Sequence, residues 1–219
     1  MRIRTLTALA AVGLAAAAPV ALAGQQSTTI GNGKGANQVQ PAPSCFPNCQ
    51  GANLTGADLR GANLIGANLY RANLRDANLT RANLTRANLR YANLTGANLT
   101  RANLYRAALN SAALNRALLY RANLTSANLA RADLTSANLT VAKLSRAFLG
   151  LARLTRASVY RANLTGADLR DAILIEANLT GANLRGASLV RANLRGANLY
   201  RAQWANTTCP NGAVTSTGC

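Results

Sequence analysis

Residues 51–70 read GANLTGADLRGANLIGANLY, and the same five-residue pattern continues without an insertion to Ala202. Alanine occupies every fifth position from Ala52 onward, and leucine follows two residues later except at Val159 and Trp204. The residue between them is Asn eighteen times and Asp three times. A strict short period indicates a repeat protein, because one quintet cannot bury its own apolar residues and must stack on its neighbours.

The period of five excludes straight helices and straight strands as the repeating element. In an α-helix of about 3.6 residues per turn, leucines five apart drift around the surface and never form one apolar stripe. In a straight strand an odd period sends successive leucines to opposite faces. Within Ala-x-Leu, however, both apolar side chains point the same way. A chain that turns after every quintet therefore directs all of them to one axis, as a solenoid with coils about 4.8 Å apart.

The composition argues against an enzyme. The 219 residues include 24 Lys and Arg against 6 Asp and Glu, a formal net charge of +18, and no His. Without His, the commonest general base and metal ligand is missing. The one acidic cluster, Asp168, Asp171 and Glu176, has Arg neighbours, so we expect ion pairs there. We predict no catalytic residue, cofactor, metal site or small-molecule substrate.

The N-terminal residues 1–23 resemble a secretory signal peptide. Arg2 and Arg4 precede an Ala/Leu/Val run, and Ala21-Leu22-Ala23 has the small-x-small form of a cleavage site. We therefore expect cleavage after Ala23 and a secreted, extracellular protein; a membrane anchor is the alternative interpretation. No later stretch has about 18 uninterrupted apolar residues, so we expect no membrane span.

Four cysteines bracket the repeats. Residues 24–44 are mostly polar and are predicted to be a disordered leader. Residues 45–50 and 203–219 are predicted caps, and an even cysteine count in an exported chain indicates disulfides. Three pairings are possible, and we favour the local pairs over a zinc site, whose usual ligand spacing is absent. These pairs are Cys45–Cys49 and Cys209–Cys219.

The quintets closely resemble those of the pentapeptide-repeat family over about 150 of the 219 residues. This resemblance implies an all-β solenoid, a right-handed, four-sided β-helix of about 30 repeats over residues 51–202. The cysteine pairs given above would make its ends disulfide-stapled. The position before Leu departs from the family's Asn or Asp mainly in residues 108–158. There we expect a less regular stretch or an apolar contact patch.

Four quintets per coil would distribute the outward side chains over four faces. We call residues 61–65, 81–85 and every later quintet twenty residues on the third face; it carries no acid, whereas the second face is balanced. Tyrosines precede three of its arginines at one corner, an arrangement that suits a polyanion with flat or apolar groups. The predicted binding residues are Arg81, Arg101, Arg121, Lys143, Arg161, Arg185, Arg201, Tyr120, Tyr160 and Tyr200.

One rhythm argues for three sides instead. Arginines recur every fifteen residues from Arg71 to Arg161. On three sides they would form one straight row, which like-charge repulsion between neighbouring strands disfavours. On four sides they move around the coil, so we keep four.

The leading functional hypothesis is a secreted, non-catalytic scaffold that associates with an anionic polymer of the cell envelope. Solubility for Arg and backbone shielding for Tyr are the simpler explanation of the same residues. The alternative function is a protein-interaction or self-assembly module, dimerising through the C-terminal cap. The family's best-known activity, mimicry of DNA toward a type II topoisomerase, implies an acidic surface, so this basic chain disfavours it. Ice binding by a threonine row is a distant third, because Tyr interrupts the row of Thr80, Thr100, Thr140 and Thr180.

Overall fold

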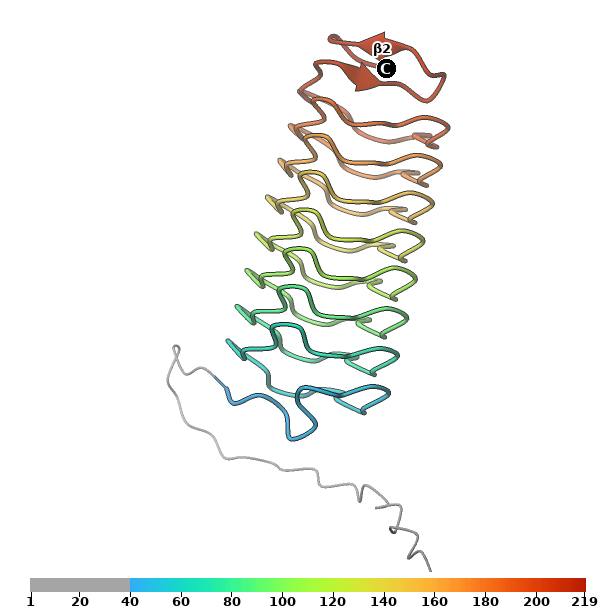
Figure 1. Ribbon diagram of the computed structural model, residues 1–219. Coiled ribbons are helices and arrows are strands. Elements are labelled where there is room, and N and C mark those ends of the chain that lie inside the picture. The colour runs from blue at the N-terminus through green and yellow to red at the C-terminus, as the bar shows by residue number, and fades with distance from the viewer. Residues whose placement is uncertain (1–39) are drawn as a thin grey trace, which may run out of the picture. The chain divides into compact units, whose positions relative to one another are not determined.

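The computed structural model describes residues 40–219, and these form a column of stacked coils (Figure 1). Parallel β-bridges join residues twenty apart, from Asn48↔Asn68 to Ser188↔Thr208. Each coil thus contains four quintets, with a turn after each one. The three-sided alternative is wrong, because it would pair residues fifteen apart. The predicted signal peptide and most of the predicted leader lie outside the described residues.

Backbone hydrogen bonds along the column hold the coils together. The N–H of Leu84 donates to the carbonyl of Asn103 at 2.7 Å, and the N–H of Asn103 donates back to the carbonyl of Ala82 at 2.9 Å. The same pair of bonds recurs in successive quintets, so interior coils are bonded to the coils above and below. This satisfies backbone groups that burial would otherwise leave unpaired.

Each corner is a β-turn whose third residue has positive φ. The N–H of Ala82 donates to the carbonyl of Leu79 at 2.9 Å, and Arg81 between them has a φ of 59°. A type II turn has positive φ at this place, which normally selects glycine. Glycine occupies it in nine quintets, including Gly51 and Gly181, and a residue with a side chain occupies it in the others.

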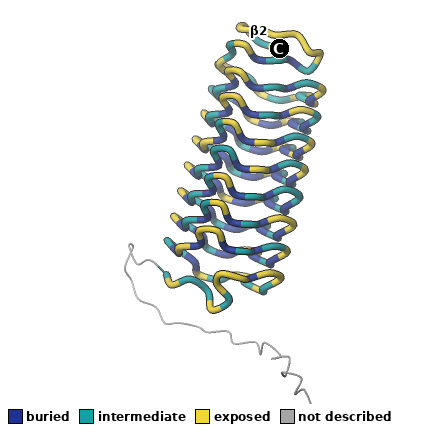
Figure 2. Tube along the Cα trace, in the orientation of Figure 1, coloured by how far each residue is buried: buried dark blue, intermediate teal, exposed yellow. Residues whose placement is uncertain are grey.

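The interior consists of the alanines and leucines of the quintets. From Ala62 to Leu189, every inward-facing Ala, Leu and Val is 0–1% exposed. Figure 2 shows these buried residues recurring in every coil along the column. The expectation that both apolar residues of each quintet face one axis is confirmed.

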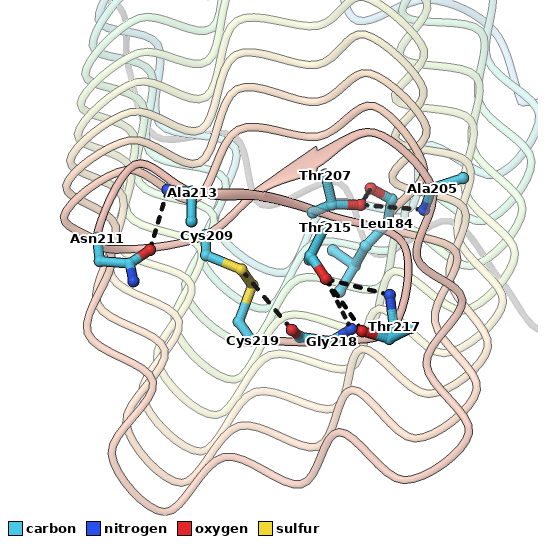
Figure 3. Close-up of a disulfide and its surroundings, with 10 residues drawn as sticks. All are labelled: Leu184, Ala205, Thr207, Cys209, Asn211, Ala213, Thr215, Thr217, Gly218 and Cys219. Atoms are coloured by element: carbon cyan, nitrogen blue, oxygen red, sulfur yellow. Dashed lines mark hydrogen bonds between the residues drawn. A yellow bond between two sulfur atoms is a disulfide. The ribbon is translucent and has the colours of Figure 1, made fainter.

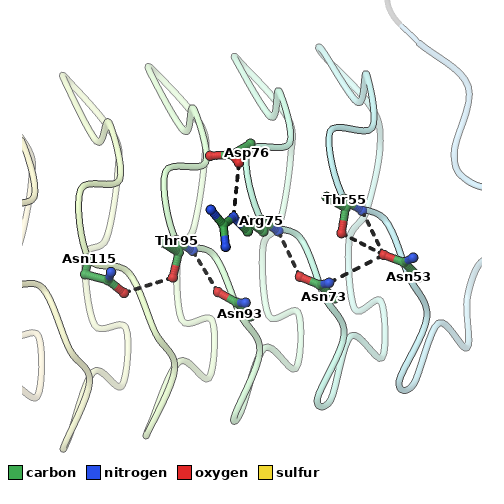
Figure 4. A network of polar contacts seen from close by, with 8 residues as sticks. All are labelled: Asn53, Thr55, Asn73, Arg75, Asp76, Asn93, Thr95 and Asn115. Carbon is green, nitrogen blue, oxygen red and sulfur yellow. Dashed lines mark hydrogen bonds and ion pairs between the residues drawn. The ribbon is translucent and has the colours of Figure 1, made fainter.

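The outward Asn between Ala and Leu closes the corner that follows it. In Figure 4 the side-chain oxygen of Asn93 accepts the backbone N–H of Thr95 at 3.1 Å, and that of Asn53 accepts Thr55 Oγ1 at 2.7 Å. Asn and Asp suit this position, because their short side chains bond backbone two residues ahead. Several asparagines also bond from coil to coil, as Asn73 does to Asn53 at 3.5 Å.

The first coil begins earlier than the sequence analysis predicts. Asn48 bridges to Asn68, and Cys49, which is 1% exposed, takes the place of the inward leucine. Gln40, in the predicted leader, donates its backbone N–H to the carbonyl of Arg60 at 2.8 Å. The end of the leader therefore contacts the first coil. The predicted disulfide Cys45–Cys49 is confirmed.

The C-terminal end repeats this arrangement. Strand β1 (Thr207–Thr208) continues the repeat register, and Cys209, 5% exposed, follows at the inward leucine position. The chain then turns back as β2 (Val214–Thr215), antiparallel to β1. Figure 3 shows the Cys209–Cys219 disulfide, also as predicted, and Thr207 Oγ1 donating to the carbonyl of Leu184 at 2.8 Å. Each disulfide thus ties a cap to a cysteine at a core position.

The segment 108–158 is as regular as the rest, so the prediction of irregularity is wrong. Its bridges continue at every fifth residue. Large apolar side chains are exposed there on two separate sides, Leu118 with Val141 and Phe148 with Leu151. Among residues 40–219 we find no helix with the length and apolarity that crossing a bilayer requires.

Candidate functional site

The third face carries all seven predicted cations on its exposed side. Five arginines begin their quintets at the corner where this face starts, Lys143 lies in its middle between Asn123 and Asn163, and Arg185 lies at its far edge. All seven are exposed. The twenty-residue bridging brings them onto one side of the column, as the sequence analysis predicts. The corner residues are Arg81, Arg101, Arg121, Arg161 and Arg201.

Three tyrosines lie at this same corner, which we call the Tyr–Arg corner and define as residues 60–61, 80–81 and so on to 200–201. The guanidinium of Arg121 lies 5.2 Å from the ring centre of Tyr120. Arg161 lies 5.2 Å from the ring of Tyr160, and Arg201 lies 5.1 Å from that of Tyr200. Cation–π contacts of this kind hold each guanidinium over a ring. The corner therefore presents aromatic and cationic groups together.

Three further Tyr–Arg contacts were not predicted. Arg106 lies 5.1 Å from the ring of Tyr105, and Arg71 lies near both Tyr70 and Tyr91, at 5.2 and 5.8 Å. Tyr followed directly by Arg across a turn is the common signal, and it predicts every one of these pairs except that of Arg71 with Tyr91. That last pair depends on the stacking of coils, because residues 71 and 91 are twenty apart.

The acidic side chains neutralise arginines elsewhere. Within residues 40–219 the ion pairs join Asp58 with Arg60, Asp76 with Arg75, Glu176 with Arg156, Asp168 with Arg170, and Asp171 with Arg191. The expectation of ion pairing in the 168–176 cluster is confirmed. Hydrogen bonds from the arginines lower the pKa of these carboxyl groups at Asp58, Asp168, Asp171 and Glu176.

Most third-face cations have no carboxylate partner. Within the described part of the chain, no ion pair includes Arg101, Arg121, Lys143, Arg161, Arg185 or Arg201. No Asp or Glu occurs in any third-face quintet. Guanidinium groups are donors only and match carboxylate, sulfate and phosphate oxygens. This side of the molecule can therefore hold anions.

Many of the arginines lie at a turn position that the fold would fill more easily with glycine. Thirteen arginines occupy the positive-φ turn position, including Arg101 at 59° and Arg121 at 55°. A residue with a Cβ is strained there by about 1–2 kcal/mol, whereas glycine is not. Glycine would therefore serve the turn better. The same positive φ occurs at Ser111, Val141 and Leu151, so the turn does not select arginine.

A comparison with protein families matches this chain to the model described as pentapeptide repeats, in eight copies. The matched segments are residues 48–81, 67–104, 77–116, 102–140, 132–171 and 172–203. The chain belongs to the pentapeptide repeat family. The matched residues include the third face and the Tyr–Arg corner. The candidate site of this pentapeptide repeat protein therefore lies on the repeats themselves.

Solved structures of the family include similar chains. HetL, a pentapeptide repeat protein involved in heterocyst differentiation regulation from the cyanobacterium Nostoc sp. strain PCC 7120, is 40% identical, with a TM-score of 0.76 over 77% of this chain and 76% of its own. A pentapeptide repeat protein of the Arabidopsis thaliana thylakoid lumen is 31% identical over 45% of this chain and 68% of its own, with a TM-score of 0.44. Curated proteins gave no match.

Proposed function

We propose that this pentapeptide repeat protein is an exported, non-catalytic scaffold whose third face binds an anionic polymer of the cell envelope. The observation that carries the proposal is the set of exposed third-face cations without carboxylate partners, from Arg101 to Arg201. The Asp and Glu residues of the chain all lie in quintets of the other three faces. A row of like charges one coil apart repels itself and favours an anionic partner that neutralises it.

The signal-like residues 1–23 support export, and the two disulfides suit an oxidising compartment. Counterion release would make binding fall steeply as salt rises. Non-specific charge attraction would also weaken as salt rises. The test must therefore compare variants of this protein in which equal numbers of charges are reversed on different faces.

The experiment compares two fourfold charge reversals on immobilised heparin between about 50 and 200 mM salt. The third-face variant carries Arg101→Glu, Arg121→Glu, Arg161→Glu and Arg201→Glu. The control carries Arg86→Glu, Arg116→Glu, Arg131→Glu and Arg146→Glu, which occupy the same positive-φ turn position at the other three corners and lie outside the ion pairs. Both variants have the same net charge.

We expect the third-face variant to elute at clearly lower salt than the control. The physical reason is that cations gathered on one side of the column contact a linear polymer together, whereas charges distributed over three other corners do not. Equal elution of the two variants would reduce the interaction to total charge and contradict the proposal.

Self-assembly is the second candidate, and the last coil favours it. Leu194, Leu199 and Trp204 pack against the core but are only partly buried. Within residues 40–219, the backbone N–H groups of Leu194 and Leu199 have no hydrogen-bond acceptor. Open strand edges of this kind can pair with another chain. Light scattering of the protein with and without residues 203–219 tests this candidate. It predicts the mass of a dimer for the full chain and a different mass once the cap is deleted.

A further inference from the structure

A shallow, open depression of about 530 Å³ lies on the C-terminal half of the third face. It spans three successive coils, because its corner residues are twenty apart. The lining residues are Arg161, Ala162, Asn163, Gly181, Asn183, Arg201 and Gln203.

The glycine at position 181 opens this depression. The corner row reads Arg161, Gly181, Arg201, whereas in the N-terminal half arginines follow one another in consecutive coils. A Cβ added to Gly181 would lie 3.2 Å from Cγ of Arg161, and a longer side chain would extend into the space between the two arginines. A side chain at position 181 would therefore crowd Arg161 and enter the depression, which has a cation on each side.

Both flanking arginines are held in place. Arg161 lies over the ring of Tyr160 and Arg201 over that of Tyr200, at 5.2 and 5.1 Å. Neither forms an ion pair within the described residues. Restraint of the side chains lowers the entropy lost when they bind an anion. These two guanidinium groups therefore offer restrained donors on both sides of the opening.

The floor of the depression adds amide donors. Asn163, Asn183 and Gln203 stack through successive bridges. The side-chain oxygen of Asn163 accepts Thr165 Oγ1 at 2.6 Å, and that of Asn183 accepts the backbone N–H of Arg185 at 3.2 Å. Within residues 40–219 the NH₂ groups of these two asparagines donate no hydrogen bond.

The N-terminal half of the same row differs. There the NH₂ group of Asn123 donates to Asn103 Oδ1 at 2.9 Å, which closes the ladder. At the depression the side-chain oxygens of Asn163 and Asn183 accept hydrogen bonds, whereas their NH₂ groups donate none within residues 40–219. A group rich in oxygen acceptors and negative charge fits this surface.

We propose that the depression binds the carboxylate or sulfate of a sugar residue in an acidic polysaccharide, with sugar rings against Tyr160 and Tyr200. This inference rests on the proposed function and names its ligand class and site. Tyr160 and Tyr200 lie two coils apart along the column, which is about 10 Å at strand spacing. That distance is close to the length of one disaccharide in an extended β-linked glycan.

The decisive variant is Gly181→Arg, which fills the depression while adding a positive charge. Charge alone predicts equal or tighter binding, whereas the proposed site predicts weaker binding. The matched control is Gly51→Arg at the diagonally opposite corner. Gly51 has nearly the same φ, 65° against 67°, and also has an arginine, Arg71, one coil away in its row.

The probes are hyaluronan, which carries only carboxylates, chondroitin sulfate, and oligo(dT). For Gly181→Arg we expect at least a tenfold loss of affinity for the glycan that wild type binds, with Gly51→Arg unchanged or tighter. Binding of hyaluronan identifies a carboxylate, and preference for chondroitin sulfate identifies a sulfate. Tighter glycan binding by Gly181→Arg, or wild-type binding to oligo(dT) alone, overturns the proposal.

A second variant covers the case in which Gly181→Arg does not fold. Asn183→Asp places a carboxylate on the floor without a change of shape, and Asp58, Asp133 and Asp168 already occupy the same quintet position elsewhere. We expect it to lose glycan binding, while Asn178→Asp on the second face does not. Equal effects of the two would overturn the site. The third-face charge reversal includes both flanking arginines, Arg161 and Arg201. Loss of binding in that variant together with normal binding by Gly181→Arg would therefore remove the depression and leave the polyanion face, whereas equal elution of the two fourfold variants would remove both.

Discussion

The inside and the outside of this solenoid are made by the same quintets but follow different rules. Leu118 and Leu119 are adjacent, yet Leu119 is fully buried while Leu118 is 43% exposed. Inward positions hold Ala and Leu almost without exception, whereas outward positions change from coil to coil. Packing dictates the first set, since interiors are filled at crystal-like density. The second set is free to vary, and the proposed binding site lies on this outer surface.

The largest expected effect tests this contrast within one quintet. Leu119→Ala should destabilise the protein by about 2–5 kcal/mol, because it leaves a cavity in the filled interior. Leu118→Ala should change stability by less than about 0.5 kcal/mol, since its side chain contacts solvent. Urea unfolding measures both. Similar losses for the two variants would break the comparison.

A smaller effect should separate stability from binding on the outer surface. Arg101→Gly and Arg131→Gly both relieve positive-φ strain, and neither arginine follows a tyrosine. After the extra unfolded-state entropy of glycine is subtracted, each should stabilise the protein by about 0.5–1 kcal/mol.

Only Arg101→Gly should reduce retention on heparin, because Arg131 lies at the opposite corner. Thermal unfolding and salt elution of the two variants provide the readouts. Loss of stability in both would mean that the arginines serve the turn after all.

The smallest expected effect is acid destabilisation through the surface ion pairs. Asp58 and Glu176 have a lowered pKa in the folded protein because of hydrogen bonds from Arg60 and Arg156. A lowered carboxyl pKa stabilises the fold above its ordinary value, 3.8 for Asp58 and 4.5 for Glu176, and this contribution is lost as the pH falls below it.

The melting temperature should therefore fall slightly between pH 5 and pH 3 and stay flat from pH 5 to 7, where the chain has no His to titrate. Exposed pairs contribute little, so the fall should be a few degrees at most. A rise in the melting temperature on acidification would contradict the assignment. The variant Asp58→Asn should show a smaller fall.

The periodicity was sufficient for the interior, whereas the grouping of third-face cations also needed the family resemblance. Each inward Ala and Leu could be assigned because the period and the alternation within Ala-x-Leu leave one arrangement that buries them all. The family resemblance supplied the four sides, which the bridges between residues twenty apart now show. That number in turn places Arg101, Arg121 and Arg161 in one row.

The ends were predicted less well. The repeat was predicted to begin at Gly51, whereas the first bridge lies at Asn48; Pro47 and Cys49 occupy the places of Ala and Leu in later quintets. Counting back in fives from Leu54 reaches Cys49, so the register was present although the residue types were not. Cys209 lies five residues beyond Trp204 in the same way. Cysteine is readily buried as a small apolar residue, and its disulfide then anchors the cap.

The depression at Gly181 was not predictable from pattern alone. Glycine at the turn position adopts positive φ without strain, and it does so in nine quintets. The effect of Gly181 depends on its neighbours one coil below and above, Arg161 and Arg201, and on where their side chains lie. Side-chain orientation of this kind follows from three-dimensional packing and not from the period.

The twenty-residue coil also constrains how the protein can change in length. Inserting or deleting twenty residues keeps every later side chain in its row. Inserting or deleting a single quintet preserves the buried pattern and the hydrogen-bonded stacking, but it turns everything beyond it by a quarter of a circuit. One such change between residues 140 and 160 would move Tyr160 and Tyr200 away from the side that holds Tyr120. The fold tolerates length variation by fives, whereas the surface tolerates it only by twenties.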